Sequence, residues 1–326
     1  MTTALTLGAA ALLFTSVAQA QTGGVMEREV TFGATPALPG TLSLPDGSGR
    51  VPAVVLVHGS GPGDRDETVG ANKPFRDLAA GLVRQGIAVL RYDKRTRVAP
   101  LSFLGRAFTV DDEVIDDALA AVKMLRTEPR VDPARIVVLG HSLGGLLAPR
   151  IATRDPQVAG IVLMAGATRK SLPDMITAQF AYLASLPGAD TAALAQQRQA
   201  LEAPMQQVRA LTPADSASTM PIGGAPPSYW LDLARYDVVA TTRALTIPIL
   251  VLAGGRDYQV PPPDVDDWLQ AVGPRPNLEV KRYPALNHLF IAGEGTPSPA
   301  EYETAGRVDP AAIDDLARWV KSLPPR

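Results

Sequence analysis

Short, almost continuously apolar runs recur along the chain, and segments with helical spacing separate them. The runs cover residues 52–59 (PAVVLVHG), 87–93 (IAVLRYD), 135–140, 160–166, 247–254 and 278–284. A strand buried on both faces of a parallel sheet shows this pattern, because helices cover both of its faces. The runs therefore predict a mostly parallel central sheet. Residues 28–34 and 40–45 predict an antiparallel strand pair ahead of it.

Amphipathic segments occupy the intervals between these runs. They cover residues 73–86, 110–129, 265–272 and 311–323. The second of them has Asp111, Asp112 and Glu113 in its first turn and Lys123 and Arg126 near its end, which suits the helix dipole. Alternating strands and helices predict an α/β fold with a doubly wound sheet.

One interval breaks this alternation. Residues 167–246 contain no strand candidate, whereas 174–186 and 190–212 have helical patterns and 221–230 (PIGGAPPSYW) has the composition of a loop. A long insertion at a sheet edge is typical of a lid or cap. We expect a helical cap at residues 168–240 on a core of residues 27–167 and 241–323. The alternative is a helical decoration with no role in binding.

The chain has 326 residues, a net charge of −2, three histidines and no cysteine. The absence of cysteine excludes disulfides, thiolate nucleophiles and zinc–thiolate sites. The near-neutral charge offers no basic footprint for nucleic acid, so we expect no nucleic-acid partner.

The N-terminus bears on the compartment. Residues 5–17 are apolar over the length of a signal-peptide core, and Ala18-Gln19-Ala20 matches the A-x-A cleavage pattern, although no Lys or Arg precedes the apolar run. We expect residues 1–20 to be a signal peptide and the chain to be exported to the periplasm or secreted. The alternative is an ordinary hydrophobic tail. No later run is long enough to cross a bilayer, so we expect no membrane span in the mature protein.

Candidate chemistry begins where the run 135–140 ends. Gly140-His141-Ser142-Leu143-Gly144 matches the G-x-S-x-G nucleophile elbow, in which glycines make room for a serine in a strained strand-to-helix turn. The alternative is a tight structural turn. A dinucleotide loop is not indicated, because a serine stands where the pattern G-x-G-x-x-G needs glycine.

A serine nucleophile needs a base, and the chain offers His58, His141 and His288. His141 adjoins the serine, so its side chain should project away from the serine side chain. His58 ends the strand run 52–59. Only His288 follows the chain order Ser…Asp…His of this architecture, so we expect it to be the base. The alternative is a surface loop histidine.

The base needs a carboxylate that orients it. Asp257 directly follows the apolar run 247–254, and the carboxyl ends of parallel strands share the edge where the serine should lie. We expect Asp257 to be this acid, with Asp232 and Asp237 as alternatives because some hydrolases place the acid one strand earlier. A turn-stabilising role for Asp257 is the structural alternative.

Acyl transfer also needs N–H donors for an oxyanion. The backbone N–H of Leu143 should supply one, and the glycine-rich loop 58–63 should supply the other. Ser60 is the expected second donor, with Gly61 as the alternative. The alternative interpretation of this loop is a simple polar turn.

Two further groups are open to two interpretations each. Asp93, in RYDKR, stands at a strand end among cations. In one interpretation this cluster recognises a carboxylate or phosphate of the substrate. In the other, it forms an ion pair with the loop 64–66. Tyr229, Trp230 and Tyr236 either line an acyl pocket or fill the core.

HGSGPGDRDE, IAVLRYDKR, VDPARIVVLGHSLGG, LVLAGGRDYQVPP and LNHLF follow one another at plausible spacings. In these motifs, residues 27–323 resemble the α/β-hydrolase superfamily. They are similar to bacterial serine esterases of the dienelactone-hydrolase and acyl-CoA-thioesterase-like group, and to serine-aminopeptidase-like hydrolases. The resemblance implies a triad of Ser142, Asp257 and His288. Dienelactone hydrolases carry a cysteine nucleophile, which this chain lacks, so lactone opening by that route is not implied.

We therefore expect an exported serine carboxylesterase that acts on a small-molecule ester and needs no cofactor and no metal. An acyl-CoA thioesterase is an alternative that fits poorly with export. A serine peptidase or aminopeptidase is another, although no site for a substrate amine can be identified in the sequence. A non-catalytic binding protein on the same scaffold is disfavoured, because all three triad residues are present.

Overall fold

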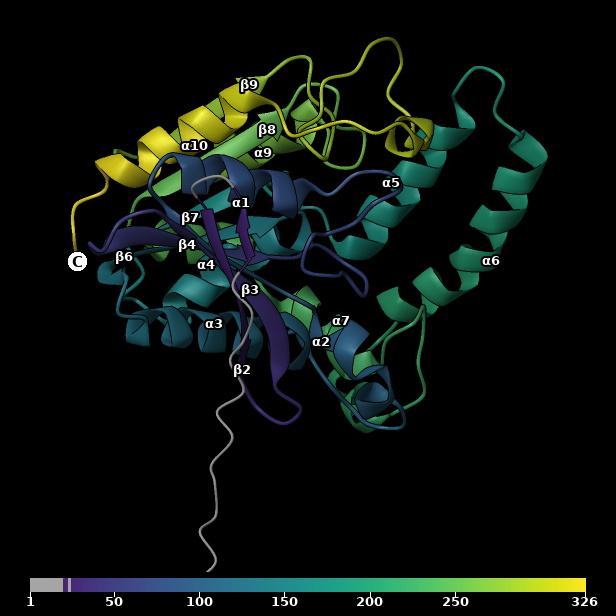
Figure 1. Ribbon diagram of the computed structural model, residues 1–326. Helices are drawn as coiled ribbons and strands as arrows, with labels where there is room; N and C mark the ends of the chain where they lie inside the picture. The colour runs from purple at the N-terminus through teal and green to yellow at the C-terminus, as the bar shows by residue number, and fades with distance from the viewer. Residues whose placement is uncertain (1–19, 23–24) are drawn as a thin grey trace, which may run out of the picture.

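One sheet runs through the computed structural model, which describes residues 20–22 and 25–326 (Figure 1). Its strand order is β1-β2-β3-β5-β4-β6-β7-β8-β9. The strands are β1 (Ala20–Thr22), β2 (Val25–Phe32), β3 (Leu38–Pro45), β4 (Val51–Val57), β5 (Ala88–Tyr92), β6 (Val131–His141), β7 (Gly160–Met164), β8 (Ile249–Gly254) and β9 (Leu278–Tyr283).

The pairings β1–β2, β2–β3 and β3–β5 are antiparallel, and every pairing from β5 through β4 to β9 is parallel. The predicted fold class is confirmed, including the antiparallel strands at the front. The proposed signal peptide, residues 1–20, lies outside the described residues except for Ala20. Among the residues that the structure describes, no helix is long and apolar enough to cross a membrane.

Strand β4 shows how the sheet is buried on both faces. Val54 and Leu56 belong to one hydrophobic cluster, whereas Val55 and Val57 belong to the other, as the period of two residues requires. All four side chains are fully buried. Apolar residues at successive positions are therefore needed to fill both layers.

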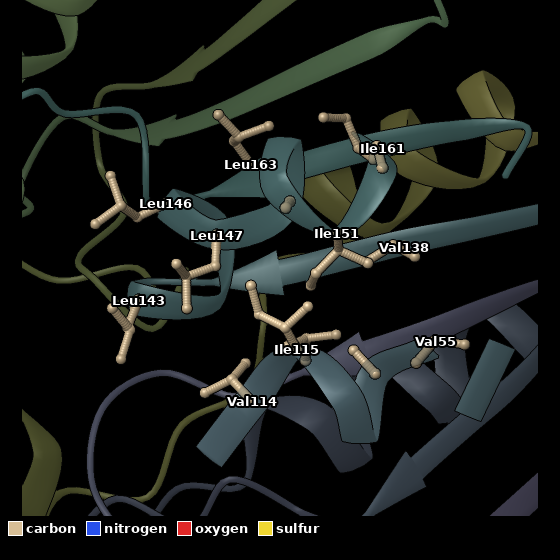
Figure 2. Packing of buried hydrophobic residues seen from close by; sticks show 14 of the residues in the cluster. Val55, Val114, Ile115, Val138, Leu143, Leu146, Leu147, Ile151, Ile161 and Leu163 are labelled. Carbon is tan, nitrogen blue, oxygen red and sulfur yellow. The ribbon is translucent and has the colours of Figure 1, made fainter. Parts of the chain in front are cut away.

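Helices cover both faces of the sheet (Figure 1). The helices α1 (Pro74–Arg84) and α10 (Pro310–Ser322) pack with the cluster on one face. The helices α3 (Asp116–Thr127), α4 (Leu143–Arg154) and α9 (Pro262–Val272) pack with the cluster on the other. Figure 2 shows the leucines of α4 beside Val114 and Ile115, which lie just ahead of α3.

The predicted helix at 110–129 begins differently from expectation. Its first turn, Asp111–Ile115, is a π-helix (η2), and the α-helix starts only at Asp116. Short elements precede it, namely α2 (Arg95–Val98) and the 3₁₀ turn η1 (Pro100–Phe103). A π-helical turn adds one residue to the turn and often marks a functional site. Here it places Glu113 in the protein interior.

Between β7 and β8 the described chain is helical. It contains α5 (Leu172–Ala184), α6 (Thr191–Arg209), the 3₁₀ turn η3 (Pro213–Ala217), α7 (Pro227–Arg235) and α8 (Val238–Ala244). In Figure 1, α6 lies on the outside of α5, away from the sheet. A further 3₁₀ turn, η4 (Pro299–Glu303), precedes α10.

The expected loop at 221–230 is wrong in its second half, where α7 begins at Pro227. The paired prolines of PIGGAPPSYW suggested a loop. Proline is, however, favoured at the first position of a helix, where its missing N–H costs nothing.

Candidate active site

Ser142 lies alone between the last residue of β6, His141, and the first residue of α4, Leu143. Its backbone has φ 52° and ψ −116°, a conformation that non-glycine residues rarely adopt. A Cβ added at Gly140 would lie 2.0 Å from the carbonyl oxygen of Gly144, and one added at Gly144 would lie 2.3 Å from that of Val57. The glycines therefore leave the space that this strained turn requires.

The loops after β8 and β9 bring Asp257 and His288 together. His288 Nδ1 lies 2.8 Å from Asp257 Oδ2, and both side chains are buried. The other carboxylate oxygen, Oδ1, accepts hydrogen bonds from the backbone N–H of Gln259 at 2.8 Å and of Val260 at 2.9 Å. A carboxylate only accepts, so His288 carries its proton on Nδ1 and leaves Nε2 as the basic nitrogen.

The alternative acids serve other contacts. Asp232 makes a two-pronged ion pair with Arg150, with distances of 2.9 and 3.0 Å. Asp237 caps α8, where its side chain accepts a hydrogen bond from the backbone N–H of Ala240. Neither carboxylate is bonded to His288, whereas Asp257 is.

The glycine-rich loop after β4 passes beside the serine. A Cβ added at Gly59 would lie 3.1 Å from Ser142 Cβ. The Gly59 N–H already donates to Glu67, so it is not free to bind an oxyanion. Leu143 is the first residue of α4, where an N–H has no acceptor within the helix. The assignment of Ser60, with Gly61 as the alternative, and Leu143 as oxyanion donors stays a prediction.

His141 does not face the serine as a base would. Its Nδ1 forms an ion pair with Glu67 Oε2 at 3.0 Å, and its Nε2 donates to the carbonyl oxygen of His288 at 2.9 Å. Glu67 uses its other oxygen to accept the Gly59 N–H at 2.8 Å. One buried pair thus ties the loop that carries His288 to the loop beside Ser142.

The surroundings of Glu67 and His141 favour the charged form of each side chain. Burial alone would raise the pKa of Glu67, but the neighbouring His141, together with weaker contributions from other neighbours, holds this pKa below its ordinary value. Burial alone would lower the pKa of His141, but Glu67, together with weaker contributions from other neighbours, raises this pKa above 6.5. Burial lowers the pKa of His58, despite the charge of Glu67, so this third histidine is neutral at pH 7.

A second buried pair holds the other side of the Gly59 peptide. Lys94 Nζ donates to the Gly59 carbonyl oxygen at 2.9 Å and pairs with Glu113 Oε1 at 2.7 Å. Both charged side chains are almost completely buried. The Gly59 N–H is therefore held by the negative charge of Glu67, and the Gly59 carbonyl oxygen by the positive charge of Lys94.

Sequence reasoning missed this network. Glu67 belongs to the charged run DRDE, and nothing in the run distinguishes the residue that folds inward. In the structure, Glu67 differs from the rest of the run in its strained backbone, which has a positive φ. The described non-glycine residues with positive φ are Glu67, Ser142, Ala165 and Phe290. Such strain gathers at functional sites. Besides Ser142 itself, Glu67 pairs with the neighbouring His141, Ala165 follows the residue whose carbonyl accepts the Ser142 N–H, and Phe290 lies in the loop of His288.

The ion-pair interpretation of Asp93 is confirmed. Its carboxylate accepts hydrogen bonds from the Arg65 backbone N–H at 2.8 Å and from Arg65 Nη2 at 3.0 Å. Asp93 therefore fixes the loop that carries Glu67 to the end of β5. Tyr229 and Trp230 are buried and line a cavity that opens at Ser142, whereas the Tyr236 hydroxyl donates to the Leu146 carbonyl oxygen.

Among the residues that the structure describes, no group of three or more histidine, aspartate or glutamate side chains is placed to hold a metal ion. What the site offers instead is a strained serine, a histidine–aspartate pair and a rigidly held loop of backbone N–H groups.

Comparison with known proteins supports this picture. A family model described as serine aminopeptidase, S33, matches residues 51–294. The chain is 43% identical over 294 residues to the esterase EstD of Thermotoga maritima, an alignment that covers 90% of this chain and 67% of EstD. The chain belongs to the α/β-hydrolase superfamily, in this serine aminopeptidase-like family.

Solved structures show the same hydrolase fold. An esterase of Pyrococcus furiosus matches with a TM-score of 0.54 and 18% identity, over 91% of each chain. Est1E from Butyrivibrio proteoclasticus matches with a TM-score of 0.54 and 17% identity, over 90% of this hydrolase and 96% of Est1E.

Proposed function

We propose that this hydrolase cleaves carboxylic esters, with Ser142 as nucleophile, His288 as general base and Asp257 as the acid that orients the base. The observation that carries the proposal is the buried 2.8 Å contact between His288 and Asp257 at the sheet edge where the strained Ser142 turn lies. The similarity to EstD, an esterase, supports ester cleavage over other acyl transfers.

The chemistry follows from this arrangement. His288 Nε2 accepts the proton of Ser142 Oγ as the oxygen attacks the ester carbonyl carbon. The N–H groups of Leu143 and Ser60 stabilise the resulting oxyanion, whose charge also faces the positive N-terminus of α4. His288 then protonates the departing alcohol. Water attacks the acyl-enzyme by the same route, so the acid is released and Ser142 regains its proton.

A substrate panel tests the proposal. We expect the chain that starts at Gln21 to hydrolyse p-nitrophenyl esters, and Ser142→Ala to abolish turnover while changing the free energy of unfolding by no more than about 1–2 kcal/mol. The same panel includes an acyl-CoA thioester and an aminoacyl peptide substrate. Faster turnover of either, at matched acyl groups, would replace ester cleavage by thioesterase or peptidase activity. Unchanged turnover in Ser142→Ala would exclude the proposed nucleophile.

We further propose that the chain is exported through a signal peptide at residues 1–20. The apolar run and the Ala18-Gln19-Ala20 pattern support this proposal. Expression of the full chain in a bacterial host, followed by cell fractionation and N-terminal sequencing, tests it. A product that begins at Gln21 in the periplasm or medium is expected, and an uncleaved cytoplasmic product would contradict it.

A further inference from the structure

Ser142 lies where two cavities of unequal size meet. The large cavity has a volume of about 680 Å³ and the small cavity about 260 Å³. Both are lined by Ser60, Gly61, Pro62, Ser142 and Gln259, so they share the wall around the serine. A bound ester would therefore place one of its two halves in each cavity.

The walls of the two cavities differ in chemistry. The large cavity is mainly apolar and aromatic, with Phe108, Leu146, Met175, Ile176, Tyr229 and Trp230 among its lining residues. The small cavity has a larger polar share in its wall than the large one, with His58, Glu67, Thr68, His141 and His288 among its lining residues. Because the charged pair of Glu67 and His141 lines the small cavity, an extended alkyl chain gains less there than in the large cavity.

The direction of proton transfer decides which half of the ester enters which cavity. In the tetrahedral intermediate the oxyanion points to backbone N–H groups, and the leaving oxygen must lie within reach of the proton on His288. His288 lines the small cavity and is absent from the lining of the large one. The alcohol half therefore lies on the side of the small cavity, which leaves the large cavity for the acyl half.

We propose that the preferred substrates are esters of a bulky apolar acid with a small alcohol. This inference rests on the proposed esterase function and specifies its substrate class. The volume of the large cavity falls within the range of about 300–1,000 Å³ that is usual for ligand sites, and that of the small cavity falls below it.

Of the two cavities at Ser142, the helical insertion lines only the large one. Residues of α5 and α7, including Ile176 and Trp230, line the large cavity, whereas the small cavity is lined only by residues outside 168–240. The insertion therefore contacts the acyl half, and substitutions in it should change acyl preference without changing alcohol preference.

A pair of isomeric esters tests the assignment directly. Methyl octanoate and heptyl acetate have the same atoms and similar hydrophobicity, but the long chain is on the acyl side in the first and on the alcohol side in the second. Release of acid is followed by pH-stat titration below the solubility limit. We expect kcat/KM to be at least about tenfold higher for methyl octanoate, the discrimination that one methylene can give in an apolar pocket. Equal rates, or faster hydrolysis of heptyl acetate, would overturn the assignment.

Two variants locate the effect. Ile176→Trp fills part of the large cavity and should lower the ratio of kcat/KM for methyl octanoate over methyl butanoate by about tenfold. Val69→Phe fills part of the small cavity and should lower the ratio for propyl butanoate over methyl butanoate while leaving the acyl-length ratio unchanged. The reverse pattern would place the acyl half in the small cavity.

Failure of the proposed function would look different, because no ester would then be hydrolysed above the Ser142→Ala background.

Discussion

The buried Glu67–His141 pair makes a prediction whose size and pH dependence both follow from the structure. Glu67→Gln keeps an oxygen that can accept the Gly59 N–H, which is now bonded at 2.8 Å, but it removes the negative charge 3.0 Å from His141. Breaking a buried ion pair costs about 3–5 kcal/mol, and a retained hydrogen bond restores about 1 kcal/mol. We therefore expect a loss of about 2–4 kcal/mol in the free energy of unfolding.

The loss should depend on pH in a defined direction. The pKa of His141 is raised above 6.5 on folding, so its contribution is complete below pH 6.5 and fades as the pH rises through the raised value. The pKa of Glu67 is lowered below 4.5 on folding, so its contribution is complete above pH 4.5 and fades as the pH falls through the lowered value. The pair therefore contributes most between pH 4.5 and 6.5.

Urea unfolding of wild type and Glu67→Gln at about pH 5.5 and about pH 9 measures this difference. Glu279→Gln is the matched control, because Glu279 forms a half-exposed pair with Lys281 at 3.1 Å and should cost less than about 1 kcal/mol. A loss for Glu67→Gln that is as small as that of the control, or that grows as the pH rises, would refute the reasoning.

Further predictions concern the turn and the acid. Asp257→Asn should lower kcat for an ester by about 10⁴-fold, because the amide can donate to His288 Nδ1 and stabilise the wrong tautomer, whereas Asp232→Asn should retain most activity. Steady-state kinetics on the two purified variants compare them, and equal losses would argue against Asp257. Gly140→Ala should destabilise the fold by more than about 3 kcal/mol, because its Cβ meets backbone at 2.0 Å. Gly49→Ala, with open space around its Cβ, should stay within about 0.5 kcal/mol in the same urea titration.

The fold could be predicted from the sequence because apolar runs report burial directly. Strands buried on both faces, such as β4 and β6, must be apolar at successive positions. Each predicted run accordingly overlaps a strand of the structure. The chain order of Ser142, Asp257 and His288 also allowed these residues to be named before their side chains could be placed. The structure brings Asp257 and His288 into contact, and the catalytic roles stay predictions.

The buried charged pairs around the site could not be predicted, because they depend on which polar residues fold inward. Asp64, Arg65, Asp66 and Glu67 form one charged run, yet only Glu67 among them is buried. Its partner, His141, comes from a strand that is distant in the sequence. The π-helical turn that buries Glu113 likewise leaves no sequence signature, because its acidic first turn is equally typical of an α-helix.

The most direct test of the central claim is a covalent label on the nucleophile. An alkyl p-nitrophenyl phosphonate reacts with an activated serine to give a stable adduct that resembles the tetrahedral intermediate. Tryptic digestion and mass spectrometry then locate it. We predict one adduct per chain, on Ser142, with activity lost in proportion to labelling and no labelling of Ser142→Ala. An adduct on another residue, or full ester turnover by a chain labelled at Ser142, would contradict the account.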